Sequence, residues 1–130
     1  MKSLNILALA AVLVAVSGCT AKESASPKSD TAESGAHVAV AATDTACTLS
    51  AAEGAPGATD FVVTNGGSKV TEVYVYGSGG QQRVLGEAEN IPPGVQRTLT
   101  VSLDSPGAYT VACKPGMVGD GISSTYAVKG

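Results

Sequence analysis

Two side chains near the C-terminal end of the chain could take part in metal chemistry. In the stretch GAYTVACKPGMVGDG, a strand-like run ends at Cys113, and Met117 follows a Pro-Gly turn. A blue-copper electron-transfer centre needs one cysteine, two histidines and usually a weak axial methionine. The chain contains a single histidine, His37, which lies far from Cys113 in the sequence. Ligand count therefore excludes a type 1 copper electron carrier, and His37 is interpreted as a surface residue.

The N-terminus carries signals of export. It has one early lysine, an apolar run from Ile6 to Val16, and then the ending Val-Ser-Gly-Cys. The run is too short for a transmembrane helix and has the length of a signal-peptide core. The ending resembles a lipobox, whose cysteine becomes the lipidated mature N-terminus. We expect a lipoprotein signal peptide over residues 1–18 and lipid on Cys19, which would anchor the protein to a membrane of the cell envelope, outside the cytoplasm.

Composition predicts a flexible tether followed by one domain. After Cys19, residues up to 35 include no large apolar side chain and are rich in Ser, Ala, Thr and charges. Such a segment, 19–35, cannot bury enough surface to fold. Residues 36–130 suffice for one small domain.

The same composition argues against two classes of function. The chain has a net charge of −3, no basic cluster, one Phe and no Trp, so nucleic acid is not expected as a partner. It has no G-x-S-x-G or H-E-x-x-H motif and no second histidine to activate a nucleophile. We therefore do not expect an enzyme.

Two cysteines, Cys47 and Cys113, remain once Cys19 is lipidated, and two interpretations of them stay open. Oxidation is the default outside the cytoplasm, and a disulfide between them would add about 4 kcal/mol of stability in the loop-entropy model. Two thiolates with one or two carboxylates could instead bind a metal ion; thiolates suit Cu(I) or Zn, and carboxylates suit harder ions such as Fe(III). We favour the disulfide.

These residues must be positioned by short strands, because the folded part shows no helical period. Turn signals rich in Gly, Pro and Asn separate eight predicted strands. The strands are 37–42, 47–51, 59–65, 69–77, 83–89, 95–103, 108–113 and 124–129. This pattern predicts an all-β sandwich or barrel of antiparallel strands.

Period-two alternation predicts which side chains face the core. The inward sets are Leu99, Val101 and Leu103; Tyr109, Val111 and Cys113; and Cys47 with Leu49. Tyr109 also follows a Pro-Gly corner at the start of a strand, as in a tyrosine corner, where the hydroxyl bonds back to nearby backbone.

The acidic residues are predicted on outward positions. Glu72, Tyr74 and Tyr76 alternate with two valines and form an outward stripe, suited to packing against a partner or to lying on the exposed sheet. Glu87 and Glu89 share one face before a Pro-Pro-Gly turn. Two such carboxylates usually form a solvated pair, but they can also bind a cation.

Several segments of the folded part occur in an order and at a spacing that match a known family. They are Cys47 after an Asp-Thr-rich strand end, Glu72 after the VTN strand, the segment ENIPPG, and Pro-Gly-x-Tyr-x-x-x-Cys ending at Cys113. From about residue 36 to 130, the chain thus resembles the N-terminal cupredoxin-like domain of EfeO, the periplasmic component of a bacterial iron-uptake system. This resemblance implies an eight-stranded Greek-key β-sandwich.

The resemblance also implies an extracytoplasmic metal site for copper or iron and an envelope metal-uptake component as partner. Carried over by position, its ligands would be Cys47, Glu72 and Cys113, with Glu87 and Glu89 as a second acidic cluster. The family often has an acid where this chain has Tyr74. Two functions are therefore expected: a metal-handling accessory, or a metal-free interaction module held by a disulfide.

Overall fold

The computed structural model describes residues 35–130. The predicted signal peptide 1–18, the predicted lipid acceptor Cys19 and all but the last residue of the predicted tether lie outside the described residues. No helix in the described part of the chain is long and apolar enough to cross a membrane.

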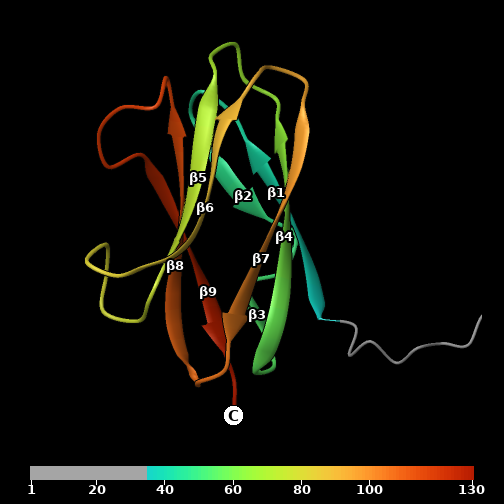
Figure 1. The fold of residues 1–130 in the computed structure, drawn as a ribbon, viewed down its shortest axis with the longest axis vertical. Coiled ribbons are helices and arrows are strands. Elements are labelled where there is room, and N and C mark those ends of the chain that lie inside the picture. Colours follow the sequence, from blue (N-terminus) through green and yellow to red (C-terminus); the bar gives the residue numbers. More distant parts are fainter. Residues whose placement is uncertain (1–34) are drawn as a thin grey trace, which may run out of the picture. The chain divides into compact units, whose positions relative to one another are not determined.

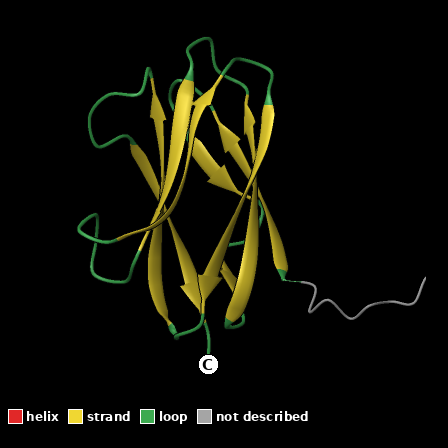
Figure 2. Ribbon diagram, viewed as in Figure 1, coloured by secondary structure: helices red, strands yellow, loops and turns green. Residues whose placement is uncertain are grey.

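The described residues form nine strands in two sheets (Figures 1 and 2). They are β1 (Ala36–Ala42), β2 (Cys47–Leu49), β3 (Glu53–Gly54), β4 (Gly57–Asn65), β5 (Thr71–Tyr76), β6 (Val84–Ile91), β7 (Gln96–Leu103), β8 (Gly107–Pro115) and β9 (Ile122–Val128). One sheet has the order β2-β1-β4-β7, and the other has the order β3-β9-β8-β5-β6. The pairs β1–β4 and β3–β9 are parallel, and the other pairs are antiparallel.

The predicted all-β sandwich is confirmed, with two differences in detail. All eight predicted strands are present with shifted ends, but the implied count of eight is wrong for residues 35–130, because β3 is a ninth strand. This two-residue strand is too short to show alternation, and it exists because it pairs with the C-terminal β9. The expectation of antiparallel pairing is also wrong for one long pair, since β1 and β4 are parallel over seven residue pairs.

The core lies between the sheets and consists of the side chains that alternation placed inward. Leu99, Val101, Leu103, Val111 and Cys113 are all buried. At the centre, the rings of Phe61 on β4 and Tyr126 on β9 meet edge to face, with centroids 5.5 Å apart. Because the two rings come from different sheets, this contact joins the layers.

The tyrosine corner is confirmed. Tyr109 is buried at the start of β8, and its hydroxyl donates a hydrogen bond of 2.7 Å to the backbone carbonyl of Ser105. The bond fixes the turn between β7 and β8.

Tyr109→Phe is expected to lower the free energy of unfolding by about 1 kcal/mol, since it removes one hydrogen bond and keeps the buried ring. Urea denaturation of the purified protein measures this change. Tyr76→Phe provides the comparison, because Tyr76 is a buried tyrosine away from the corner whose hydroxyl forms no hydrogen bond within residues 35–130. A Tyr109→Phe protein as stable as wild type would show that the corner bond contributes nothing.

At the other end of the sandwich, drawn uppermost in Figure 1, a buried asparagine holds the loops together. The Asn65 side chain is 1% exposed and donates two hydrogen bonds of 2.8 Å, to the carbonyls of Lys69 and Ile91. Its oxygen accepts a bond of 2.9 Å from the Gly67 amide. The backbone of Asn65 also bonds with Val95 and Gly94, so one residue ties β4 to the loops before β5 and β7.

Candidate functional site

The two cysteines of the folded part form a disulfide, as the sequence interpretation favoured. Cys47 opens β2 in the four-stranded sheet, and Cys113 lies near the end of β8 in the five-stranded sheet. Their sulfurs are 2.04 Å apart, and their Cα atoms are 5.5 Å apart. Both residues are buried, at 5% and 0% exposure. The bond therefore joins the two sheets through the core.

In this oxidised form the disulfide prevents the two cysteines from binding a metal ion as thiolates. Each sulfur is bonded to the other, so neither is a thiolate available to a metal ion. His37, the one histidine, lies on β1 with a side chain that is 66% exposed, and its Nδ1 is 3.5 Å from Asp60 Oδ2. Met117 lies in the turn after β8 with a φ of 57°. These residues do not fit a type 1 copper centre.

The predicted metal ligands are separated by the five-stranded sheet: the two cysteines lie on its core side, and the three glutamates lie on its outer side. Val73 is buried and is in register with Cys113, so these positions face the core. Glu72 and Tyr74 flank Val73 and therefore face outward. Glu87, which pairs with Tyr74, and Glu89 lie on exposed positions of the neighbouring strand β6. Among residues 35–130, no three His, Cys, Asp or Glu side chains are grouped closely enough to hold a metal ion.

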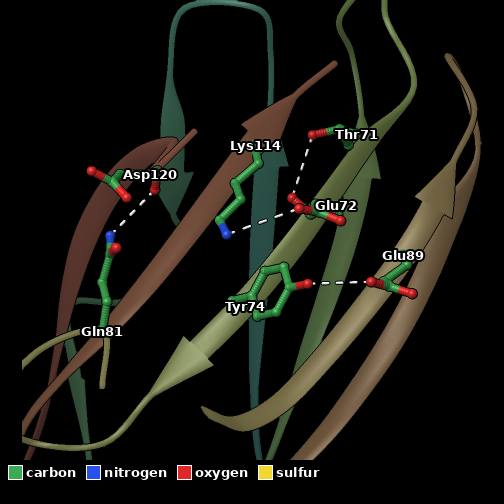
Figure 3. Close-up of polar contacts among 7 residues, drawn as sticks. All are labelled: Thr71, Glu72, Tyr74, Gln81, Glu89, Lys114 and Asp120. Atoms are coloured by element: carbon green, nitrogen blue, oxygen red, sulfur yellow. Dashed lines mark hydrogen bonds and ion pairs between the residues drawn. The ribbon is translucent and has the colours of Figure 1, made fainter. Parts of the chain in front are cut away.

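A compact polar cluster occupies the outer face of β5 and β8, and Figure 3 shows three of its members, Glu72, Tyr74 and Lys114. We call Glu72, Tyr74, Tyr76 and Lys114 the tyrosine face. Lys114 Nζ lies 3.9 Å from Glu72 Oε1 and 4.1 Å from the centre of the Tyr74 ring. The rings of Tyr74 and Tyr76 stack with centroids 5.6 Å apart. The lysine is thus held by an ion pair and a cation–π contact at once.

The predicted stripe of Glu72, Tyr74 and Tyr76 does face outward, but it is not an exposed stripe. Glu72 is 7% exposed and Tyr76 is 3% exposed. Lys114 pairs with Glu72 across β5 and β8, and its ammonium group lies over the stacked rings of Tyr74 and Tyr76, so these side chains shield one another from solvent. Lys114 was not expected from the sequence. Only the register, which pairs it with Glu72, reveals its role.

The environment of Tyr74 disfavours its ionised form. Burial of the phenol, followed by the negative charge of Glu72, raises the pKa of Tyr74 to about 12. Its hydroxyl also donates a hydrogen bond of 3.2 Å to Glu89, and the charges of Glu87 and Glu89 act in the same direction. Tyr74 is therefore neutral at any physiological pH.

The raised pKa of Tyr74 predicts a loss of stability in alkali. An unfolded chain releases the tyrosine proton near pH 10, whereas the folded protein holds it to about pH 12. Between these values the unfolded state binds fewer protons, so the stability falls as the pH rises. We expect Tyr74→Phe to lose stability less steeply than wild type between about pH 10 and 12 in urea denaturation. Glu89→Gln is expected to fall between the two, and equal slopes for wild type and Tyr74→Phe would contradict the assignment.

Two loops approach each other beside the tyrosine face. The side-chain amide of Gln81, between β5 and β6, donates a hydrogen bond of 3.2 Å to the backbone carbonyl of Asp120, between β8 and β9 (Figure 3). This bond spans 39 positions of the sequence, and no local pattern indicated it.

Comparison with known proteins gives a family and a fold. A family model described as the cupredoxin-like domain matches residues 6–123. The structure resembles Na-dithionite reduced auracyanin from the photosynthetic bacterium Roseiflexus castenholzii, with a TM-score of 0.55 and 13% identity over 74% of this chain and 100% of that chain. It also resembles an azurin (Az-iso2) from the obligate methylotroph Methylomonas sp. strain J, with a TM-score of 0.54 and 15% identity over 73% of this chain and 98% of that chain. No curated protein matches the chain. At these identities the structural likeness shows the fold alone.

Proposed function

The chain belongs to the cupredoxin-like domain family, and on that premise we propose that it is a disulfide-stapled interaction module rather than a copper electron carrier. The observation that carries this proposal is the Cys47–Cys113 bond. A type 1 copper centre needs a cysteine as a free thiolate ligand. Here Cys113 is bonded to Cys47 and joins the two sheets instead, so the two cysteines stabilise the scaffold.

The rigid scaffold supports a role in presenting a surface. Asn65 immobilises the loops at one end, and Lys114 fixes the tyrosine face on one side. Preformed surfaces bind partners at a smaller entropic cost than mobile ones. A stapled sandwich of this kind suits recognition of another envelope protein.

We further propose that the module is displayed as a lipoprotein outside the cytoplasm. The apolar run and the Val-Ser-Gly-Cys ending at Cys19 support this placement, and a buried disulfide is typical of an oxidising compartment. Cys19→Ala should move the protein from the membrane fraction to the soluble fraction. Retention in the membrane fraction would contradict lipid anchoring through this residue.

The experiment that tests the central proposal measures thiols and copper on the same sample. The purified protein, in the absence of reductant, should contain no titratable thiol at Cys47 or Cys113 in denaturant. Added Cu(II) should produce no intense visible band of a thiolate–copper centre. Free thiols in the native protein, or such a band without added reductant, would overturn the proposal.

A metal-handling role of the EfeO type is the second candidate, and one observation favours it. Glu72, Glu87 and Glu89 all raise the pKa of Tyr74, so three carboxylates lie on the same outer face around this phenol, although within residues 35–130 they are not grouped closely enough to form a preformed metal site. Oxygen donors of this kind suit a hard ion such as Fe(III). Lys114 already neutralises part of this charge.

Calorimetry with Fe(III) and Cu(II) on the oxidised protein separates the two candidates. The interaction module should show no stoichiometric binding of either metal. Saturable binding that is lost in the double variant Glu87→Gln/Glu89→Gln, but kept in Glu53→Gln on β3, would support metal handling instead. Glu53 is a suitable control because it lies on the opposite edge of the same sheet.

A further inference from the structure

A small cavity lies beside the tyrosine corner, away from the disulfide and the tyrosine face. Its volume is about 210 Å³. The wall is formed by Arg83 with Leu85, by three serines (Ser78, Ser102 and Ser105), and by Tyr109, with Gly77 at its edge. Since about 10 to 15 Å³ of such space admits one water molecule, the cavity has room for several. It is large enough for a small ion or acid and too small for a peptide.

The wall is built by two chain segments that are held in place. The Gly77 amide donates a hydrogen bond of 2.8 Å to the Arg83 carbonyl and closes the loop between β5 and β6. A side-chain carbon on Gly77 would lie 3.4 Å from Arg83 Cδ, so the arginine stem runs over the glycine. On the other segment, the Tyr109 hydroxyl bonds the Ser105 carbonyl.

The two segments also touch directly. A side-chain carbon placed on Gly107 would lie 3.2 Å from Ser78 Cβ. The glycine therefore allows the β7–β8 corner to approach the β5–β6 loop closely. The cavity is the space that remains between them.

The cavity has one positively charged residue and several hydroxyl groups in its wall, and no acidic partner for them. Lys114, Lys129 and His37 each lie within 4.0 Å of a carboxylate, whereas Arg83 has no such partner among residues 35–130. No acidic residue lines the cavity. Serine hydroxyls and a guanidinium together are the groups that bind oxyanions in proteins, because each can donate a hydrogen bond to a negatively charged oxygen.

We propose that this cavity, the Arg83 cavity, binds a small oxyanion through the guanidinium of Arg83 and the hydroxyls of the surrounding serines. The shared chemistry is a compact group with two or more charged oxygens, as in phosphate, sulfate or a small carboxylate. The planar guanidinium group can donate two hydrogen bonds to two oxygens of the same anion, so it favours such a group over a monoatomic anion like chloride. This inference is independent of the proposed interaction role, since the cavity shares no residue with the disulfide or the tyrosine face.

Amide chemical-shift titration of the purified, isotopically labelled protein tests the proposal. Inorganic phosphate, sulfate and acetate are added separately at constant ionic strength, with chloride as the balancing anion. We expect saturable shifts at Gly77, Ser78 and Ser105, with a dissociation constant of about 1 to 10 mM for at least one oxyanion. The comparison of phosphate and sulfate with acetate shows whether the cavity prefers a tetrahedral or a planar oxyanion.

Two variants that remove the same charge make the test specific. Arg83→Gln should weaken binding at least about tenfold, because it removes the charge-assisted hydrogen bonds. Arg97→Gln is the matched control, since Arg97 is exposed on β7 and has no carboxylate within 4.0 Å in the described residues. It should bind as wild type does.

Three outcomes would overturn the proposal. The first is that none of the three oxyanions causes saturable shifts up to about 100 mM. The second is that Arg83→Gln binds the oxyanion as tightly as wild type does. The third is that Arg97→Gln weakens oxyanion binding as much as Arg83→Gln does. The last outcome would mean that the anions respond to net charge and not to the cavity. Both variants change exposed side chains, and their native spectra without ligand verify that folding is unaffected.

Discussion

Replacing both disulfide cysteines by alanine, Cys47→Ala with Cys113→Ala, is expected to lower the free energy of unfolding by about 4 kcal/mol. The bond joins residues 66 positions apart, so it removes a large amount of chain entropy from the unfolded state. Small domains are stable by only about 5 to 15 kcal/mol in total. The loss would therefore leave a protein close to its folding limit.

Urea denaturation followed by circular dichroism measures this loss. Wild-type protein kept reduced by a thiol reductant, without alkylation of the buried cysteines, should show a comparable loss of stability. Thr48→Ser serves as a control, because it changes an exposed residue of β2 without touching the bond. A double variant within about 1 kcal/mol of wild type would show that the disulfide is not the main stabilising link.

Asn65→Asp is expected to have the second largest effect, with a loss of about 3 kcal/mol or more. The Asn65 amide donates to the carbonyls of Lys69 and Ile91, and a carboxylate has no hydrogen to donate to either. The substitution would also bury a negative charge beside two carbonyl oxygens, which is more costly than losing neutral hydrogen bonds. The loops before β5 and β7 would lose the residue that joins them.

The same denaturation experiment, run at several pH values, tests the role of Asn65. The Asn65→Asp protein should regain part of its stability as the pH falls and the carboxyl group becomes neutral, because a buried carboxylate has a raised pKa. Thr64→Ala, an exposed neighbour on β4, should change stability by less than about 0.5 kcal/mol. If Asn65→Asp resembled Thr64→Ala, the hydrogen bonds of Asn65 would not be holding the loops.

The strand pattern of this protein can be read from its sequence, because it depends on local chemistry. Alternation placed Leu99, Val101 and Leu103 in the core, and turn residues marked the ends of the strands. The Pro-Gly corner before Tyr109 predicted a hydrogen bond that the structure contains. Each of these features involves residues within a few positions of one another, so the short-range geometry of a strand or turn is enough to determine it.

The pairing of Cys47 with Cys113 could be favoured for a different reason. Only two cysteines remain in the folded part, and both were predicted to face inward. The pairing was therefore inferred by elimination, without knowledge of the distance between the two cysteines. The wider ligand set came instead from the resemblance to the EfeO domain, and the structure does not bring it together, because Glu72, Glu87 and Glu89 lie across the sheet from the sulfurs.

Only the tertiary structure decided which side chains meet across strands. Glu72 and Lys114 are brought together by the register of β5 and β8, and alternation gives a face but no register. The pairing of β3 with β9, the three bonds of Asn65 and the wall of the Arg83 cavity likewise join distant segments. Their positions follow from how two whole sheets pack. The sequence by itself therefore determined the layers and their inner faces, whereas the outer clusters and the cavity depend on non-local pairing.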